Sequence, residues 1–149
     1  MMTLRNQLLE DLKTAMRERN QVRMATLRMV RAEVQNREID AGKPLEDVDI
    51  VGIISKQVRQ HHESIEAFTT GNRPNLVKQE EAELIVLMGY LPEQLSETEI
   101  AVLASKVIQE IEATKLTDLG KTMSALMPQI RGKADGNKVR NIVSNLLSG

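Results

Sequence analysis

The sequence has no cysteine and no tryptophan, and Tyr90 and Phe68 are the only tyrosine and phenylalanine among its 149 residues. Without cysteine, the chain cannot form disulfides, thiolate metal sites or a cysteine nucleophile. With so few aromatic rings, the core must be built from aliphatic side chains and from some of the 8 methionines. The same scarcity argues against nucleic-acid binding by base stacking, which needs exposed aromatic rings.

Long apolar runs are also missing. A secretory signal or a membrane-spanning helix would need such a run. Together with the lack of cysteine, this leads us to expect a soluble, cytoplasmic protein with no membrane partner. A length of 149 residues suits one domain of moderate size or two small domains.

The common catalytic fingerprints are absent as well. Gly-Lys pairs occur at residues 42–43, 120–121 and 132–133, but none completes the phosphate-binding pattern G-x-x-x-x-G-K-[ST]. No serine lies in a nucleophile elbow, and no dinucleotide-binding fingerprint is present. We therefore predict no catalytic residues and no cofactor, and we favour a protein that is not itself an enzyme.

The histidines and the one cluster of carboxylates do not predict a metal site. His61 and His62 are adjacent, so on a helix their side chains point about 100° apart and do not share a face. The glutamates of residues 80–83 lie near the start of an amphipathic helix, where the helix dipole favours acidic side chains. Neither group alone supplies enough ligands, and we predict no metal-binding residues.

Apolar residues recur with helical spacing along nearly the whole chain, and no segment shows the strict alternation of a strand. The spacing predicts four helices in the first part of the chain, ending near residues 20, 42, 71 and 90. Three more follow. The first begins at the capping box Ser96-Glu97-Thr98-Glu99. The second starts near Asp118 and is kinked or ended by Pro128, and the last runs through residues 139–147.

The segment Leu91-Pro92-Glu93-Gln94-Leu95 separates these two groups of helices. Pro92 disfavours helical geometry in the residue before it, and we expect it to act as a hinge. We therefore predict an all-α fold with two domains. An N-terminal four-helix unit over residues 1–91 is joined through the proline hinge to a small three-helix domain over residues 96–149.

Charge is distributed unevenly, although the net charge is −1. Residues 13–31 hold six basic side chains against the single acid Glu18. Residues 116–149 hold five basic side chains against Asp118 and Asp135. Two basic segments of this kind can form a patch for a polyanion such as a nucleic acid. The alternative is that they are ordinary solvated helix faces.

Three segments resemble the YqeY family of small bacterial proteins. They are residues 24–36, MATLRMVRAEVQN, residues 90–97, YLPEQLSE, and residues 118–139, DLGKTMSALMPQIRGKADGNKV. The family shares its fold with the C-terminal tail of GatB, a subunit of the glutamine-dependent amidotransferase that converts misacylated Glu-tRNA or Asp-tRNA to Gln-tRNA or Asn-tRNA. That tail contacts tRNA, and catalysis takes place in other domains. The resemblance therefore implies an all-helical protein that binds tRNA without catalysis.

The resemblance also indicates where RNA would bind. It matches a Gly-Lys pair of the tail to Gly120-Lys121 and a Gly-Lys-Ala loop to residues 132–134. The RNA-binding residues that we expect are Lys121, Arg131, Gly132 and Lys133 in the first place, and Lys138, Arg140, Arg28 and Arg31 in the second. Where the tail commonly continues with Asn-Pro, this chain has Asp135-Gly136. The acidic side chain weakens the case for a phosphate seated directly on the last helix.

The leading hypothesis is a non-catalytic protein that binds tRNA or another folded RNA through phosphate and shape, and that does not read DNA sequence. An aminoacyl-tRNA synthetase or an amidotransferase component is a candidate protein partner. Two alternatives stay open. One is a protein–protein adaptor that docks through exposed apolar residues such as Leu91 and Leu95. The other, implied by the family alone, is an accessory to, or a part of, a carbon–nitrogen ligase that uses glutamine as amide donor.

Overall fold

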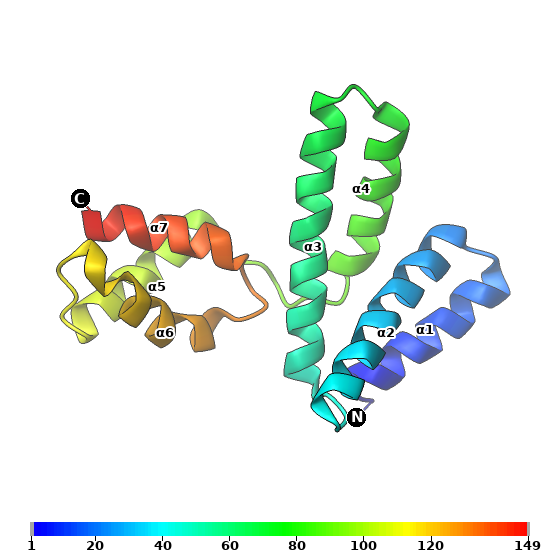
Figure 1. Cartoon of the computed structure of the whole chain (residues 1–149), viewed down its shortest axis with the longest axis horizontal. Coiled ribbons are helices and arrows are strands. Elements are labelled where there is room, and N and C mark those ends of the chain that lie inside the picture. The colour runs from blue at the N-terminus through cyan, green and yellow to red at the C-terminus, as the bar shows by residue number, and fades with distance from the viewer. Residues whose placement is uncertain (1, 149) are drawn as a thin grey trace. The chain divides into compact units, whose positions relative to one another are not determined.

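The computed structural model describes residues 2–148, and this part of the chain contains helices and no strand, which confirms the all-α prediction (Figure 1). The helices are α1 (Leu4–Glu18), α2 (Gln21–Ala41), α3 (Asp47–Thr70), α4 (Pro74–Met88), α5 (Glu97–Glu110), the short 3₁₀ helix η1 (Leu116–Asp118), α6 (Leu119–Ile130) and α7 (Gly136–Ser148). None of the helices in the described range is long and apolar enough to cross a membrane.

The chain divides into two compact units, the first ending at Leu91 and the second beginning at Pro92. The first unit holds α1 to α4, and the second holds α5 to α7 together with η1. The four helix ends expected near residues 20, 42, 71 and 90 lie close to the observed ends of α1 to α4. It stays a prediction that these two units are independent domains over residues 1–91 and 96–149.

In the first unit, α1 and α2 form one antiparallel hairpin, and α3 and α4 form a second (Figure 1). The apolar faces of the four helices meet in one core, made of Leu8, Leu12, Leu27, Val30, Val34, Ile50, Ile53, Ile54 and Leu87. Each of these side chains contributes about 1.5–3 kcal/mol when fully buried. The buried apolar residues of α3 end at Ile54, and α4 supplies only Leu87, so this core covers only part of the α3–α4 hairpin.

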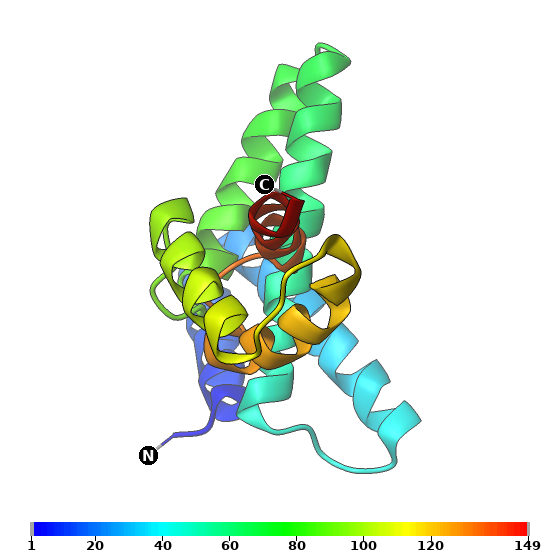
Figure 2. The ribbon, with the colours of Figure 1, turned by 90° about the vertical axis from the view of Figure 1, so that its left-hand side faces the viewer.

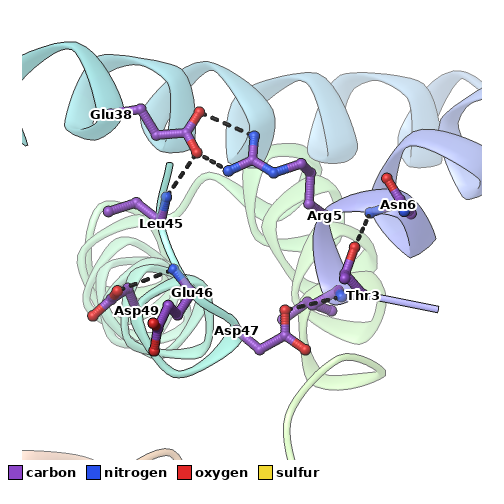
Figure 3. A network of polar contacts seen from close by, with 9 residues as sticks. Thr3, Arg5, Asn6, Glu38, Leu45, Glu46, Asp47 and Asp49 are labelled. Carbon is purple, nitrogen blue, oxygen red and sulfur yellow. Dashed lines mark hydrogen bonds and ion pairs between the residues drawn. The ribbon is translucent and has the colours of Figure 1, made fainter. Parts of the chain in front are cut away.

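A polar network joins the start of α1 to the end of α2 and the loop that follows (Figure 3). The Arg5 guanidinium forms an ion pair with Glu38, and the Leu45 amide donates a hydrogen bond of 2.9 Å to the same carboxylate. The Leu4 amide donates to Asp47 Oδ1 at 3.1 Å. The two contacts made by α1 connect residues 33 and 43 positions apart, and they hold the start of α1 against the end of α2 and the start of α3.

The second unit packs α5, α6 and α7 around its own core (Figure 2). The residues buried there are Ile100, Ala104, Val107, Ala113, Leu126, Ile130, Val139, Val143 and Leu147. Those on α5, α6 and α7 recur every three or four positions, which is the spacing of one helical face, and Ala113 lies in the loop after α5. The apolar stripe seen in the sequence therefore becomes the side of each helix that faces its two neighbours.

The start of α5 and the end of α6 follow local rules, with one difference from expectation at Pro128. The capping box at the start of α5 is confirmed: the Glu99 amide donates to Ser96 Oγ at 3.1 Å, and the Ser96 amide donates to Glu99 Oε1 at 3.0 Å. These hydrogen bonds hold the pKa of Glu99 below its usual value. Pro128 does not end α6, which continues to Ile130. In the last turn, proline removes a single backbone donor, and the helix stops soon afterwards.

Candidate nucleic-acid interface

The loop between α6 and α7 carries the glycine and two of the basic residues expected to bind RNA. The Lys133 amide donates a hydrogen bond of 2.8 Å to the Ile130 carbonyl, which closes a four-residue turn. Arg131 has φ −56° and ψ 128°, and Gly132 has φ 80°. These angles match a type II turn, whose third position needs a positive φ and so favours glycine. Gly132 is therefore required by the backbone, whatever the ligand.

The turn is held against the segment that precedes α5. Gln94 Nε2 donates to the Gly132 carbonyl at 2.8 Å, and the Leu95 amide donates to the Lys133 carbonyl at 2.8 Å. Gln94 Nε2 also lies 2.8 Å from the Pro92 carbonyl, and Leu95 packs against the core of the second unit. The two carbonyls of the turn are thus satisfied within the protein, and its backbone is fixed at two successive residues.

The side chains of this turn point to solvent. Arg131 and Lys133 are exposed, whereas Gly132 between them is buried. Within residues 2–148, the ion pairs include none made by Arg131, Lys133 or Arg140. Two cations that flank a buried glycine on a fixed turn are well placed to contact phosphate oxygens.

Lys121 lies at the other end of α6, in the first turn of the helix, and is exposed. It is ten positions before Arg131, which corresponds to about 15 Å along a helix at 1.5 Å per residue. Hydrogen bonds from the backbone amides of Thr114 and Lys115 hold the pKa of Asp118 below its usual value, with smaller help from the Lys121 and Lys115 charges. Lys121 therefore has an ionised carboxylate nearby, which offsets part of its charge.

Lys138 and Arg140 are both exposed on α7, but they do not share a face. They are two positions apart, with the buried Val139 between them, and side chains at this spacing point in nearly opposite directions on a helix. Lys138 Nζ lies 3.7 Å from Glu97 Oε1 at the start of α5. Lys138 is thus already paired, and a single ligand surface does not engage both residues.

Arg28 and Arg31 belong to the first unit, on α2. Arg28 is exposed, and Arg31 is half-buried. Arg31 lines a hollow of about 110 Å³ between α1 and α2, together with Arg5 and Val34. Its stem is therefore part of the packing of the first hairpin, and Arg28 is the more accessible of the two.

The sequence offers no signal for the part played by Gln94, because its partner Gly132 is 38 positions away. The two leucines expected to be exposed at the hinge are half-buried instead. Leu91 packs against the core of the first unit, and Leu95 packs against the core of the second. Both side chains are used by the fold, so they do not form the exposed apolar surface that an adaptor would present.

The fold and the site define an all-helical protein of two compact units, with a basic type II turn that contains a glycine in the second unit. Residues 5–147 match the family described as Yqey-like protein, and the chain belongs to this family. A relative in Pyrenophora tritici-repentis (strain Pt-1C-BFP), named "Altered inheritance of mitochondria protein 41, mitochondrial", is 35% identical over 126 residues, covering 83% of this chain and 69% of that protein.

Proteins of the same name in other fungi are also similar. The one from Lachancea thermotolerans (strain ATCC 56472 / CBS 6340 / NRRL Y-8284) is 36% identical over 106 residues, which cover 69% of this chain and 57% of the relative. The one from Saccharomyces cerevisiae (strain YJM789) is 27% identical over 131 residues, which cover 87% of this chain and 62% of the relative. The chain thus spans a little more than half to about two thirds of these relatives.

These relatives correct two expectations. A cytoplasmic protein was expected, and this is wrong, because the similar proteins are named as mitochondrial. The expectation was based on the lack of cysteine and of apolar runs, and neither feature distinguishes the cytoplasm from an organelle with a reducing interior. The description of the family as bacterial is likewise unsupported, since the relatives named above are fungal.

Proposed function

We propose that this chain is a non-catalytic RNA-binding protein that contacts the phosphate backbone of tRNA or another folded RNA through its second unit. The observation that carries the proposal is the α6–α7 turn, in which Arg131 and Lys133 are exposed on either side of a glycine with φ 80°. Hydrogen bonds from Gln94 and Leu95 fix the backbone of the turn. The resemblance of this segment to a tRNA-contacting tail supports the same conclusion.

The chemistry of the turn favours phosphate over bases. The planar guanidinium of Arg131 can donate two parallel hydrogen bonds to one phosphate, whereas Lys133 acts as a mobile point charge. Stacking on bases would need exposed aromatic rings. Tyr90 and Phe68 are half-buried, and both belong to the first unit. We therefore propose recognition of backbone and shape, with little preference for base sequence.

Lys121 would contact a second phosphate, about 15 Å from the turn along α6. Lys138 contributes less in this arrangement because Glu97 is already its partner. Arg140 lies on a different face of α7 and is outside the proposed surface. An amidotransferase component or an aminoacyl-tRNA synthetase remains a proposed protein partner, supported only by the resemblance.

The experiment is a measurement of tRNA affinity across a salt series, with two variants that remove the same charge from the same unit. Each phosphate contact adds about 0.7–0.9 to the slope of log affinity against log salt. Arg131→Gln with Lys133→Gln should therefore lower the slope by about 1.4–1.8. The matched control is Lys106→Gln with Arg140→Gln, one lysine and one arginine that are exposed and lie outside the proposed surface, and this control should leave the slope unchanged.

Equal losses in the two variants would show that only net charge matters, and the proposed site would be wrong. The same conclusion follows if the wild-type chain binds tRNA no better than an unrelated protein of equal charge. Glutaminase or transamidation activity of the isolated chain would instead support the carbon–nitrogen ligase alternative. An adaptor would be supported by a protein partner that stays bound after nuclease treatment and at high salt.

A further inference from the structure

Three side chains able to bind a metal converge between α3 and α4 of the first unit. His61 lies on α3, and Glu80 and Glu83 lie on α4. One ligand atom from each lies within 4.8 Å of those of the other two. His61 Nε2 is 3.0 Å from Glu83 Oε1 and 3.4 Å from Glu80 Oε2. The sequence shows a histidine and a group of glutamates as separate features, and the hairpin brings them together.

The other nitrogen of the His61 ring fixes its tautomer. Nδ1 lies 2.8 Å from the backbone carbonyl oxygen of Gln57, which can only accept a hydrogen bond, so Nδ1 carries the hydrogen. In the neutral ring, Nε2 then presents a lone pair, and this lone pair faces two carboxylates that also offer only lone pairs. Three acceptors in contact require either a proton, carried by the ring or by one of the carboxyl groups, or a metal ion between them.

Charge and burial favour the metal ion. The His61 side chain is 8% exposed, and those of Glu80 and Glu83 are 22% and 15% exposed. A single proton, on the ring or on a carboxyl group, would leave the group with a net charge of −1, whereas a divalent ion balances both carboxylates. Uncompensated charge is costly to bury. A histidine that donates from one ring nitrogen to a backbone carbonyl is also the usual arrangement around a bound metal.

The distances suit a small ion with little rearrangement. Zinc binds histidine nitrogen and carboxylate oxygen at about 2.0–2.2 Å, which places tetrahedral ligands about 3.3–3.6 Å apart. The distance of 3.4 Å from His61 Nε2 to Glu80 Oε2 lies within this range, and the distance of 3.0 Å to Glu83 Oε1 is slightly shorter. Gln79 Nε2 donates to Glu83 Oε2 at 3.4 Å, which leaves Oε1 directed to His61. We infer that His61, Glu80 and Glu83 bind one divalent transition-metal ion, with zinc the best match.

The position of the cluster suggests what the ion does. The buried apolar residues of α3 end at Ile54, and the next buried residues are the polar Gln57 and His61. Beyond them, the loop end of the α3–α4 hairpin extends past the α1–α2 hairpin within the first unit (Figures 1 and 2). An ion at this level would tie α3 to α4 where the apolar core no longer does so. It would stabilise the projecting end of the hairpin, and three protein ligands leave one coordination position for water.

The test uses full-length protein without an affinity tag, treated with chelator and titrated with zinc and with cobalt. Binding is followed by calorimetry, and the visible absorption of cobalt reports tetrahedral coordination. Two variants remove ligands: His61→Asn, and Glu80→Gln combined with Glu83→Gln, which keeps the shape of two partly exposed side chains. His62→Asn is the matched control, because His62 is adjacent and exposed.

The inference predicts one ion per chain, at least tenfold weaker binding in both ligand variants, and unchanged binding in His62→Asn. Saturating zinc should raise the melting temperature of the wild type by several degrees and leave that of the Glu80→Gln, Glu83→Gln variant unchanged. Absence of stoichiometric binding to the wild type would overturn the inference, as would equal losses in His62→Asn. If both ring nitrogens of His61 carry hydrogen at pH 7 by nitrogen NMR, with zinc present, a proton fills the role assigned to the metal.

Discussion

Tyr90 gives a direct test of how α1 and the end of α4 pack in the first unit. It is the only tyrosine in a chain without tryptophan, so its absorbance can be read without interference. Its hydroxyl donates a hydrogen bond to Asp11 Oδ2 at 2.5 Å. Burial of the ring, followed by the hydrogen bond and charge of Asp11, raises the pKa of Tyr90 from 10.0 to about 12, against a smaller opposing effect of Arg23.

The magnitude follows from this shift. A shift of about two pKa units corresponds to about 2.7 kcal/mol in favour of the neutral phenol. Tyr90 is only half-buried, so solvent screening reduces the effect, and we expect about 1 kcal/mol. Because the pKa is raised in the folded state, this contribution is complete below pH 10. It is lost as the pH rises from about 10, the unfolded value, to about 12.

The assay is a spectrophotometric titration of tyrosinate in native and in denatured protein. We expect a midpoint near pH 12 for the native chain and near pH 10 in denaturant. Asp11→Asn should lower the native midpoint but leave it above 10, because burial is the larger cause. Tyr90→Phe should be less stable than the wild type by about 1 kcal/mol at pH 8, and this difference should narrow toward pH 12. A native midpoint near pH 10 would mean that Tyr90 is neither buried nor hydrogen-bonded to Asp11 in solution.

Two further predictions concern the backbone and can be checked by thermal or urea unfolding. Gly132→Ala should destabilise the second unit by about 1–2 kcal/mol, because its φ of 80° is unfavourable for a residue with a Cβ. Gly52→Ala should stabilise the first unit by about 0.5–1 kcal/mol, because glycine is unfavourable inside a helix and an added Cβ on α3 meets nothing within 4 Å. Equal effects of the two changes would contradict the assignment of the turn. Ser96→Ala should cost about 1 kcal/mol by removing the cap of α5, and no loss of stability would mean that the capping box does not hold in solution.

The parts of the fold that depend on neighbouring residues could be predicted from the sequence. The capping box at Ser96 needs only a serine and a glutamate three positions later, and the structure contains it. The helical spacing of apolar residues likewise sets the all-α class. Gly132 was expected in a loop between two helices, and it lies there with a positive φ that is favourable mainly for glycine.

The contacts that shape the two candidate sites could not be predicted in the same way. Gln94 reaches Gly132 only because the segment before α5 packs beside the α6–α7 turn, and nothing local in the sequence specifies this. The sequence carries one signal for the pairing of His61 with Glu83: both residues are equally far from Asn72, in the loop between α3 and α4. In an antiparallel hairpin, such positions lie opposite each other. The pattern of each helix taken alone does not indicate that these two residues meet.

The most direct test of RNA binding is a map of the contact surface on ¹⁵N-labelled protein titrated with tRNA at low salt. If this turn binds RNA, the largest amide shifts should fall on residues 131–133 and on the first turn of α6, around Lys121. Shifts near Lys106 and Arg140, which are also basic and exposed but lie outside the proposed surface, should be small. Shifts spread evenly over all lysines and arginines, or no shifts at all, would contradict the proposal that this turn binds RNA.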